Sequence, residues 1–141
     1  MSEPEPFVFV DRVRFADLDA RGHLNNVAFL QFFEAARLAF IRELHPEHDP
    51  TVPTDEDLIV ARTEIDFRAP ADFEEEIRTR VSAGDVERNK FTVHFEMRAS
   101  RDDRLLAEGS NVVVGYDYEK GEAADIAEPL YAALRMRGPS E

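Results

Sequence analysis

The stretch from Asn25 or Asn26 to about Leu44 limits the possible folds more than any other part of the chain. It contains no glycine or proline and carries apolar residues on nearly every side. A helix on the surface of a domain keeps one polar face, so a helix with this pattern needs more than one neighbouring element to cover it. The dipeptide His45-Pro46 ends the predicted helix, because proline disfavours helical geometry in the residue before it.

Strands are predicted for most of the remaining chain. Residues 7–16 are rich in Phe and Val, which is typical of a strand. After the polar, proline-containing loop of residues 45–57, apolar and polar residues alternate with a period of two. The pattern predicts strands at 58–67, 76–83 and 91–99, a last strand from about Leu105 to Tyr118, and a short helix after Pro129.

The connections between these later strands are short and turn-like, which predicts antiparallel pairing between strands that are neighbours along the chain. An antiparallel sheet of about five strands that curls around one apolar helix buries both apolar surfaces. The sequence therefore predicts an α+β fold in which residues 1–141 form a single domain. The last strand is expected to be an exposed edge, open to pairing with a second copy.

The charge balance excludes several classes of partner. The chain has 30 acidic and 17 basic residues, a formal net charge of −13. Such a field repels nucleic acids and anionic membranes, so neither is expected as a partner. The chain has no cysteine, which excludes disulfides and thiolate metal sites. No apolar run approaches the roughly 20 residues of a membrane span, and the acidic N-terminus lacks a signal-peptide pattern, so a cytoplasmic location is expected.

Residues 15–26, FADLDARGHLNN, hold more polar side chains than the start of a helix requires. One capping residue is enough to begin a helix, so the stretch either carries more polar residues than its structure needs or takes part in chemistry. The pattern Asp-x-Asp-x-x-Gly-His-x-Asn-Asn, followed by Phe32-Phe33, Glu34 and Arg37, resembles the signature of the 4-hydroxybenzoyl-CoA thioesterase-like branch of the hotdog thioesterases. The resemblance covers the first strand, the loop and the helix closely, and the remaining strands by their order and length.

This resemblance implies the hotdog fold and hydrolysis of a fatty or aromatic acyl-CoA thioester to the free acid and CoA. It also implies a homodimer or homotetramer in which the sheets of two protomers join edge to edge. The sequence has no Gly-rich phosphate loop and no H-E-x-x-H motif, so no metal and no organic cofactor is expected. The residue types agree with this chemistry, because thioester hydrolysis needs a carboxylate and hydrogen-bond donors for the developing oxyanion. A carboxylate loop ahead of a helix supplies both, since the first N–H groups of a helix lack internal partners.

Three residues of the loop are candidates for catalysis. By the resemblance, Asp19 is the catalytic carboxylate, either nucleophile or general base; the alternative is a loop aspartate that accepts hydrogen bonds from backbone amides. His23 matches the family's histidine, and either orients water or the thioester, or ties the loop to a carbonyl. Arg21 stands where related acyl-carrier-protein enzymes have asparagine, which departs from their Asp-Asn-His pattern. The backbone N–H near Asn26 lies where the family polarises the thioester carbonyl.

Other residues of the motif are assigned to substrate binding or to structure. Asp17 is expected to cap the chain or to pair with an arginine, with direct chemistry as the alternative. Gly22 allows a tight turn or a close approach of ligand, and Asn25 is a favoured helix N-cap. Glu34 is a rival catalytic carboxylate, because another hotdog branch carries its glutamate on this helix; an ion pair with Arg37 at i+3 is the favoured alternative.

A CoA ester is anionic and requires a local basic site on this acidic chain. Arg88 and Lys90 lie in the hairpin VERNKF, where the family commonly carries basic residues near the CoA phosphates; a solvated hairpin tip is the alternative. His45 and His48 are interpreted as surface residues rather than metal ligands. Two other functions remain open: a non-catalytic acyl-thioester-binding protein on the same fold, and a hotdog dehydratase or hydratase.

Overall fold

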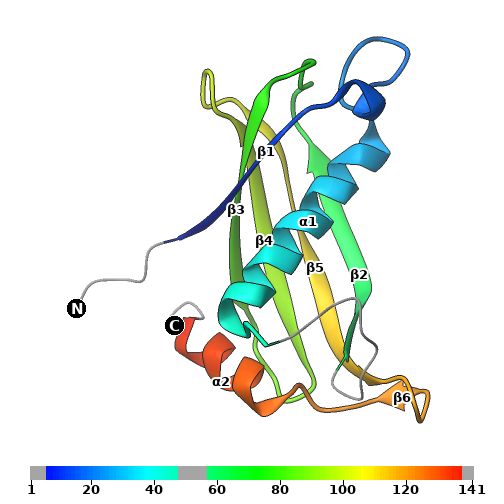
Figure 1. Cartoon of the computed structure of the whole chain (residues 1–141), viewed down its shortest axis with the longest axis vertical. Helices are drawn as coiled ribbons and strands as arrows, with labels where there is room; N and C mark the ends of the chain where they lie inside the picture. The colour runs from blue at the N-terminus through cyan, green and yellow to red at the C-terminus, as the bar shows by residue number, and fades with distance from the viewer. Residues whose placement is uncertain (1–5, 48–56, 138–141) are drawn as a thin grey trace.

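The computed structural model describes residues 6–47 and 57–137, and it holds one long helix against an antiparallel sheet (Figure 1). The helix is α1 (Asn26–Leu44), preceded by the short 3-10 helix η1 (Phe15–Asp17), and α2 (Glu128–Arg137) follows the sheet. The strands are β1 (Phe7–Arg12), β2 (Asp57–Phe67), β3 (Glu76–Gly84), β4 (Lys90–Ala99), β5 (Leu105–Asp117) and β6 (Glu122–Ala123). The five long strands lie in the order β1-β3-β4-β5-β2, and β6 pairs with β5. The predicted α+β hotdog fold is confirmed.

The core lies between α1 and the face of the sheet that α1 crosses (Figure 1). Phe33 of α1 stacks on Phe95 of β4 with ring centroids 4.3 Å apart, and Phe29 meets Phe67 of β2 edge to face at 5.3 Å. Both are preferred geometries for aromatic pairs. Leu134 of α2 is fully buried and extends this core.

One face of α1 is left uncovered by the residues that the structure describes. Val27 is 66% exposed and Leu30 is 40% exposed. The prediction that neighbouring elements cover the helix on every side is wrong for these residues, because a single sheet covers only one side of a helix. Val60 and Phe67 of β2 are also exposed. Large apolar side chains are therefore accessible on both α1 and β2.

The pairing of β2 with β3, which their short connection predicts, is wrong. Strands β1 and β4 occupy the two edges of β3, so β2 pairs with β5 instead. The hairpins β3–β4 and β4–β5 form as predicted. Because β5 lies inside the sheet, the expected exposed edge at the last long strand is also wrong. The edges of the five-strand path are β1 and β2.

The ends of the elements follow local hydrogen bonds. Strand β1 stops at Arg12 rather than at residue 16, because the Asp17 carboxylate accepts the N–H of Arg14 at 2.9 Å and turns the chain into η1. The two helices lie where the sequence predicts them. Residues 1–5 and 48–56, including His48 and most of the predicted polar loop, lie outside the described residues. In the described part of the chain, no helix is long and apolar enough to cross a membrane.

Candidate active site

The loop between η1 and α1 is a tight turn that its own backbone closes. The N–H of Asp19 donates to the carbonyl of His23 at 2.8 Å, and the N–H of Gly22 donates to the carbonyl of Asp19 at 3.0 Å. Gly22 has a φ of +81°, a left-handed conformation that residues with a side chain rarely adopt. Gly22 is therefore a turn residue, as predicted.

The Asp19 carboxylate is exposed and held by two backbone donors. Its Oδ1 accepts the N–H of Arg21 at 2.8 Å and the N–H of His23 at 3.2 Å. These hydrogen bonds, first from Arg21 and then from His23, lower the pKa of Asp19 because they stabilise the charged form. The carboxylate is therefore ionised at neutral pH. A purely structural loop aspartate would make these same two hydrogen bonds. A catalytic nucleophile or general base must also be ionised, so the contacts agree with both roles.

Asp17 and Asn25 make structural contacts. Asp17 is 4% exposed, and its carboxylate lies 3.2 Å from Nε of Arg14. This is the arginine pair that the sequence predicts. Asn25 caps α1, with its Oδ1 accepting the N–H of Ala28 at 2.8 Å, which confirms the predicted N-cap. Asn26, the first residue of α1, is exposed.

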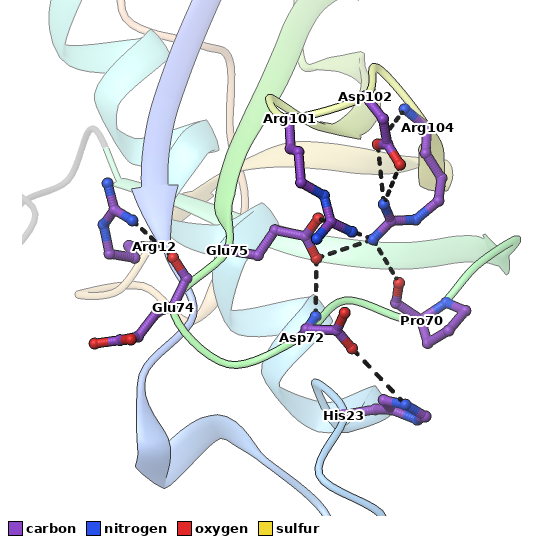
Figure 2. Close-up of polar contacts among 9 residues, drawn as sticks. All are labelled: Arg12, His23, Pro70, Asp72, Glu74, Glu75, Arg101, Asp102 and Arg104. Carbon is purple, nitrogen blue, oxygen red and sulfur yellow. Dashed lines mark hydrogen bonds and ion pairs between the residues drawn. The ribbon is translucent and has the colours of Figure 1, made fainter.

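A second loop, residues 68–75 between β2 and β3, holds the first one (Figure 2). The N–H of Leu24 donates to the carbonyl of Ala71 at 2.9 Å, and His23 and Asp72 form an antiparallel bridge. The imidazole of His23 points toward the Asp72 carboxylate in Figure 2, with Nε2 3.8 Å from Oδ1. Both the backbone and the side chain of His23 therefore contact the second loop.

Glu75 anchors this second loop in the interior. Its carboxylate accepts the N–H of Asp72 at 2.9 Å and contacts Nη2 of Arg104 at 2.9 and 3.0 Å, and Arg101 lies 3.3 Å away. Burial raises the pKa of Glu75, but the hydrogen bonds from Asp72 and Arg104 and the charges of both arginines outweigh burial, so the pKa is lowered overall. Arg104 also donates to the carbonyl of Pro70 at 3.0 Å, so one guanidinium fixes two points of the loop (Figure 2).

Sequence reasoning missed Asp72, Glu75 and Arg104. Their segments, ADFEEE and SRDDR, resemble ordinary charged turns, and the contact between Glu75 and Arg104 spans 29 positions. One feature of the sequence could have identified Glu75. The alternation of β3 puts Glu75 on the same face as Ile77 and Thr79, which are buried. A carboxylate on the buried face of a strand needs charged partners.

A cleft of about 260 Å³ runs along α1, starting one residue after Asn26. Its lining residues are Val27, Leu30, Gln31, Phe33, Glu34 and Arg37 from α1, Val60 and Thr63 from β2, and Asn111 from β5. Glu34 and Arg37 form the predicted ion pair, with 3.8 Å between Oε2 and Nη2. Nη1 of Arg37 also donates to Oδ1 of Asn111 at 3.0 Å. The rival carboxylate Glu34 therefore lies at the exposed rim of a cleft, about two helical turns beyond the Asp19 loop.

Arg88 and Lys90 lie far from the Asp19 loop in the same protomer. The second loop leads into the start of β3, and these basic residues follow the other end of that strand. Nine residues of strand separate the two ends, which corresponds to about 30 Å. Arg88 binds Glu128 of α2 at 2.7 Å and lies 3.6 Å from Asp125. The structure therefore does not bring Arg88 and Lys90 together with Asp19 in one chain.

The described residues, 6–47 and 57–137, contain no cluster of three or more His, Asp or Glu side chains that could hold a metal ion. The polar groups that do converge are carboxylates, His23 and arginines. They can supply a negative charge, hydrogen-bond donors and a titratable imidazole, which are the groups used in acyl transfer.

Comparisons with known proteins show the family of this chain. The family model described as the thioesterase-like superfamily matches residues 13–134. The acyl-CoA thioesterase YbgC of Haemophilus influenzae is 26% identical over 129 residues, which cover 91% of this chain and 93% of that protein.

Solved structures agree. The crystal structure of Slr0204, a 1,4-dihydroxy-2-naphthoyl-CoA thioesterase from Synechocystis, has a TM-score of 0.83 at 21% identity, covers 93% of this chain and 96% of its own, and shows the fold. A thioesterase from Thermus thermophilus, crystallised with coenzyme A and zinc, has a TM-score of 0.77 at 26% identity, with 91% and 96% covered. The chain therefore belongs to the thioesterase-like superfamily.

Proposed function

We propose that the protein hydrolyses acyl-CoA thioesters to a free acid and CoA, with Asp19 as the catalytic carboxylate. The observation that carries this proposal is an ionised, exposed Asp19 in the loop that leads into α1, the helix whose Val27 and Leu30 line the cleft. Family membership and the relative named acyl-CoA thioesterase support the same reaction. A single domain over residues 1–141 and a cytoplasmic location stay predictions.

Two routes are open to Asp19. As nucleophile, its carboxylate oxygen attacks the thioester carbonyl, the C–S bond breaks, CoA leaves as thiolate, and water then hydrolyses the mixed anhydride. As general base, Asp19 takes a proton from a water whose oxygen attacks the carbonyl, and that proton passes to the departing thiolate. In both routes the developing oxyanion accepts hydrogen bonds from the first N–H groups of α1 at Asn26. His23 orients the water or the thioester.

A second copy of the chain completes the molecule in this proposal. The support is the open edge of β2, the last strand of the five-strand path, and the exposed apolar side chain of Phe67 on it. An open strand edge beside apolar side chains is a surface that pairs with another chain. Light scattering at micromolar concentration is expected to give a dimer or tetramer, and a monomer would contradict the proposed assembly.

The experiment that tests the activity is release of free thiol from short, medium, long and aromatic acyl-CoAs. The wild type is expected to release thiol, and Asp19→Asn is expected to lose about a hundredfold or more in kcat. Asp85→Asn is the matched control, since Asp85 has a positive φ, which asparagine tolerates, and lies in the β3–β4 turn. Because hydrogen bonds from Arg21 and His23 lower the pKa of Asp19, the acidic limb of kcat/KM is expected below the ordinary range of an aspartate.

One observation favours a second function. Oδ1 of Asp19 already accepts two hydrogen bonds from its own loop, as a purely structural aspartate does. A non-catalytic acyl-thioester-binding protein is therefore the alternative. A folded wild type that binds acyl-CoA without releasing thiol would establish it, and thiol release that survives in Asp19→Asn would move the search to Glu34 and His23.

A further inference from the structure

The cleft along α1 is apolar near the start of the helix and polar around Arg37. Val27 and Leu30 line the part nearest the start of α1, and Phe33 continues the apolar wall. Beyond them, Arg37 of α1 donates to Asn111 of β5, and Nδ2 of Asn111 donates to Oγ1 of Thr63 at 2.9 Å. Val60 lies on the other side of Thr63, farther along β2 from the Asp19 loop.

The guanidinium of Arg37 is largely buried but weakly neutralised. Its side chain is only 13% exposed, and within the described residues its paired carboxylate is Glu34, which is 64% exposed and 3.8 Å away. Burial lowers the pKa of Arg37, and Glu34 opposes this only in part. A buried charge is stabilised by a close, desolvated partner, and an exposed carboxylate at 3.8 Å is a poor one. Asn111, which is 2% exposed, supplies a neutral oxygen and no charge.

The position of Arg37 relative to the Asp19 loop sets the size of a suitable ligand. Glu34 lies eight residues after Asn26, which corresponds to about 12 Å along a helix axis. Helical side chains lean toward the N-terminus, so the guanidinium of Arg37 reaches back to the level of Glu34. A thioester carbonyl at the start of α1 would therefore place the end of a medium-length acyl chain beside Arg37.

We propose that this cleft selects acyl groups with a carboxylate at the end remote from the thioester, and that Arg37, held by Asn111, binds that carboxylate. The inference rests on the proposed function for the position of the thioester. The net charge of −13 repels an anionic acyl group, so such a substrate needs a local cation in the cleft. A guanidinium binds a carboxylate with strong, charge-assisted hydrogen bonds.

The test compares octanoyl-CoA with suberyl-CoA, which has the same chain and a terminal carboxylate. The wild type is expected to show a kcat/KM for suberyl-CoA about tenfold or more above that for octanoyl-CoA. Arg37→Met is expected to lose about tenfold to a hundredfold in kcat/KM for suberyl-CoA, the range of a charged hydrogen bond. Its kcat/KM for octanoyl-CoA is expected to stay within about twofold.

Arg42→Met is the matched control, because Arg42 is an exposed arginine in the last turn of the same helix. It is expected to keep the full preference for suberyl-CoA. If Arg37→Met fails to fold by circular dichroism, Asn111→Asp replaces it, because a carboxylate at Asn111 neutralises the guanidinium in place and should abolish the preference. Equal rates for both thioesters in the wild type, or a preference that survives in these variants, would overturn the inference.

Failure of the proposed function gives a different result. If the folded wild type hydrolyses no thioester, calorimetric titration with suberyl-CoA and octanoyl-CoA replaces the rate measurement. Tighter binding of suberyl-CoA that is lost in Arg37→Met would support the carboxylate site in a binding protein, and equal affinities would refute it.

Discussion

Replacement of Glu75 by glutamine tests whether the buried carboxylate anchors the loop that contacts His23. Glutamine has the same shape but loses the charge that faces Arg104 and Arg101. Breaking a buried ion pair costs about 3 to 5 kcal/mol, but the side chains of Arg104 and Arg101 are 25% and 65% exposed and regain water. We therefore expect Glu75→Gln to lower the free energy of unfolding by about 2 to 3 kcal/mol.

The pH dependence of this loss gives an independent check. The pKa of Glu75 is lowered in the folded protein, so its contribution to stability is fully present above the unfolded pKa of about 4.3. That contribution disappears as the pH falls through the folded pKa. Urea denaturation, followed by circular dichroism at a fixed protein concentration, should show a constant difference between wild type and Glu75→Gln from neutral pH to about pH 5. The difference should shrink at lower pH.

Glu74→Gln is the matched control. Glu74 is adjacent and exposed, and its carboxylate points away from the arginine cluster in Figure 2. A change at such a surface position should stay within about 0.5 kcal/mol. If Glu75→Gln and Glu74→Gln have the same free energy of unfolding, or if the loss in Glu75→Gln does not depend on pH, the anchoring argument is wrong.

Two further substitutions test the backbone around the site. Asn25→Ala removes the acceptor of the Ala28 N–H and should lower the free energy of unfolding by about 1 kcal/mol. Asn25→Ser should keep most of the stability that the cap contributes, because serine is also a good N-cap. Equal losses of Tm in the two variants would contradict the role of Asn25 as a cap. Gly109→Ala would press a Cβ against the carbonyl oxygen of Glu64, so β5 and β2 must move apart. A lower Tm is expected for Gly109→Ala in a thermal melt. An unchanged Tm would show that the two strands adjust without loss of stability.

The sequence was sufficient for the elements that local physics controls. The apolar pattern of α1, the N-cap at Asn25 and the turn at Gly22 depend on neighbours within a few residues, so each was predictable. The i+3 pair of Glu34 with Arg37 was predictable for the same reason. The strands were recognised by alternation, because one face of the sheet packs on α1.

Pairing order and the second loop were not predictable in the same way. The position of β2 depends on β1, which comes 50 residues earlier in the chain and takes the edge of β3. Glu75 meets Arg104 only because the β4–β5 hairpin returns beside the start of β3. Alternation of apolar and polar residues predicts which face of a strand is buried, but not which strand lies beside it. Contacts that depend on the order of the strands therefore could not be predicted from the sequence.

The same long-range geometry bears on how the proposed thioester substrate would be held. One protomer places the Asp19 loop and the pair Arg88 and Lys90 at opposite ends of β3, about 30 Å apart. A CoA ester that used both in one chain would have to lie along the whole sheet. Arg88 is also already paired with Glu128, so removing it should disturb α2 even without substrate. A contact of these residues with CoA therefore depends on a second copy that brings its own β3–β4 hairpin near the first protomer's Asp19 loop.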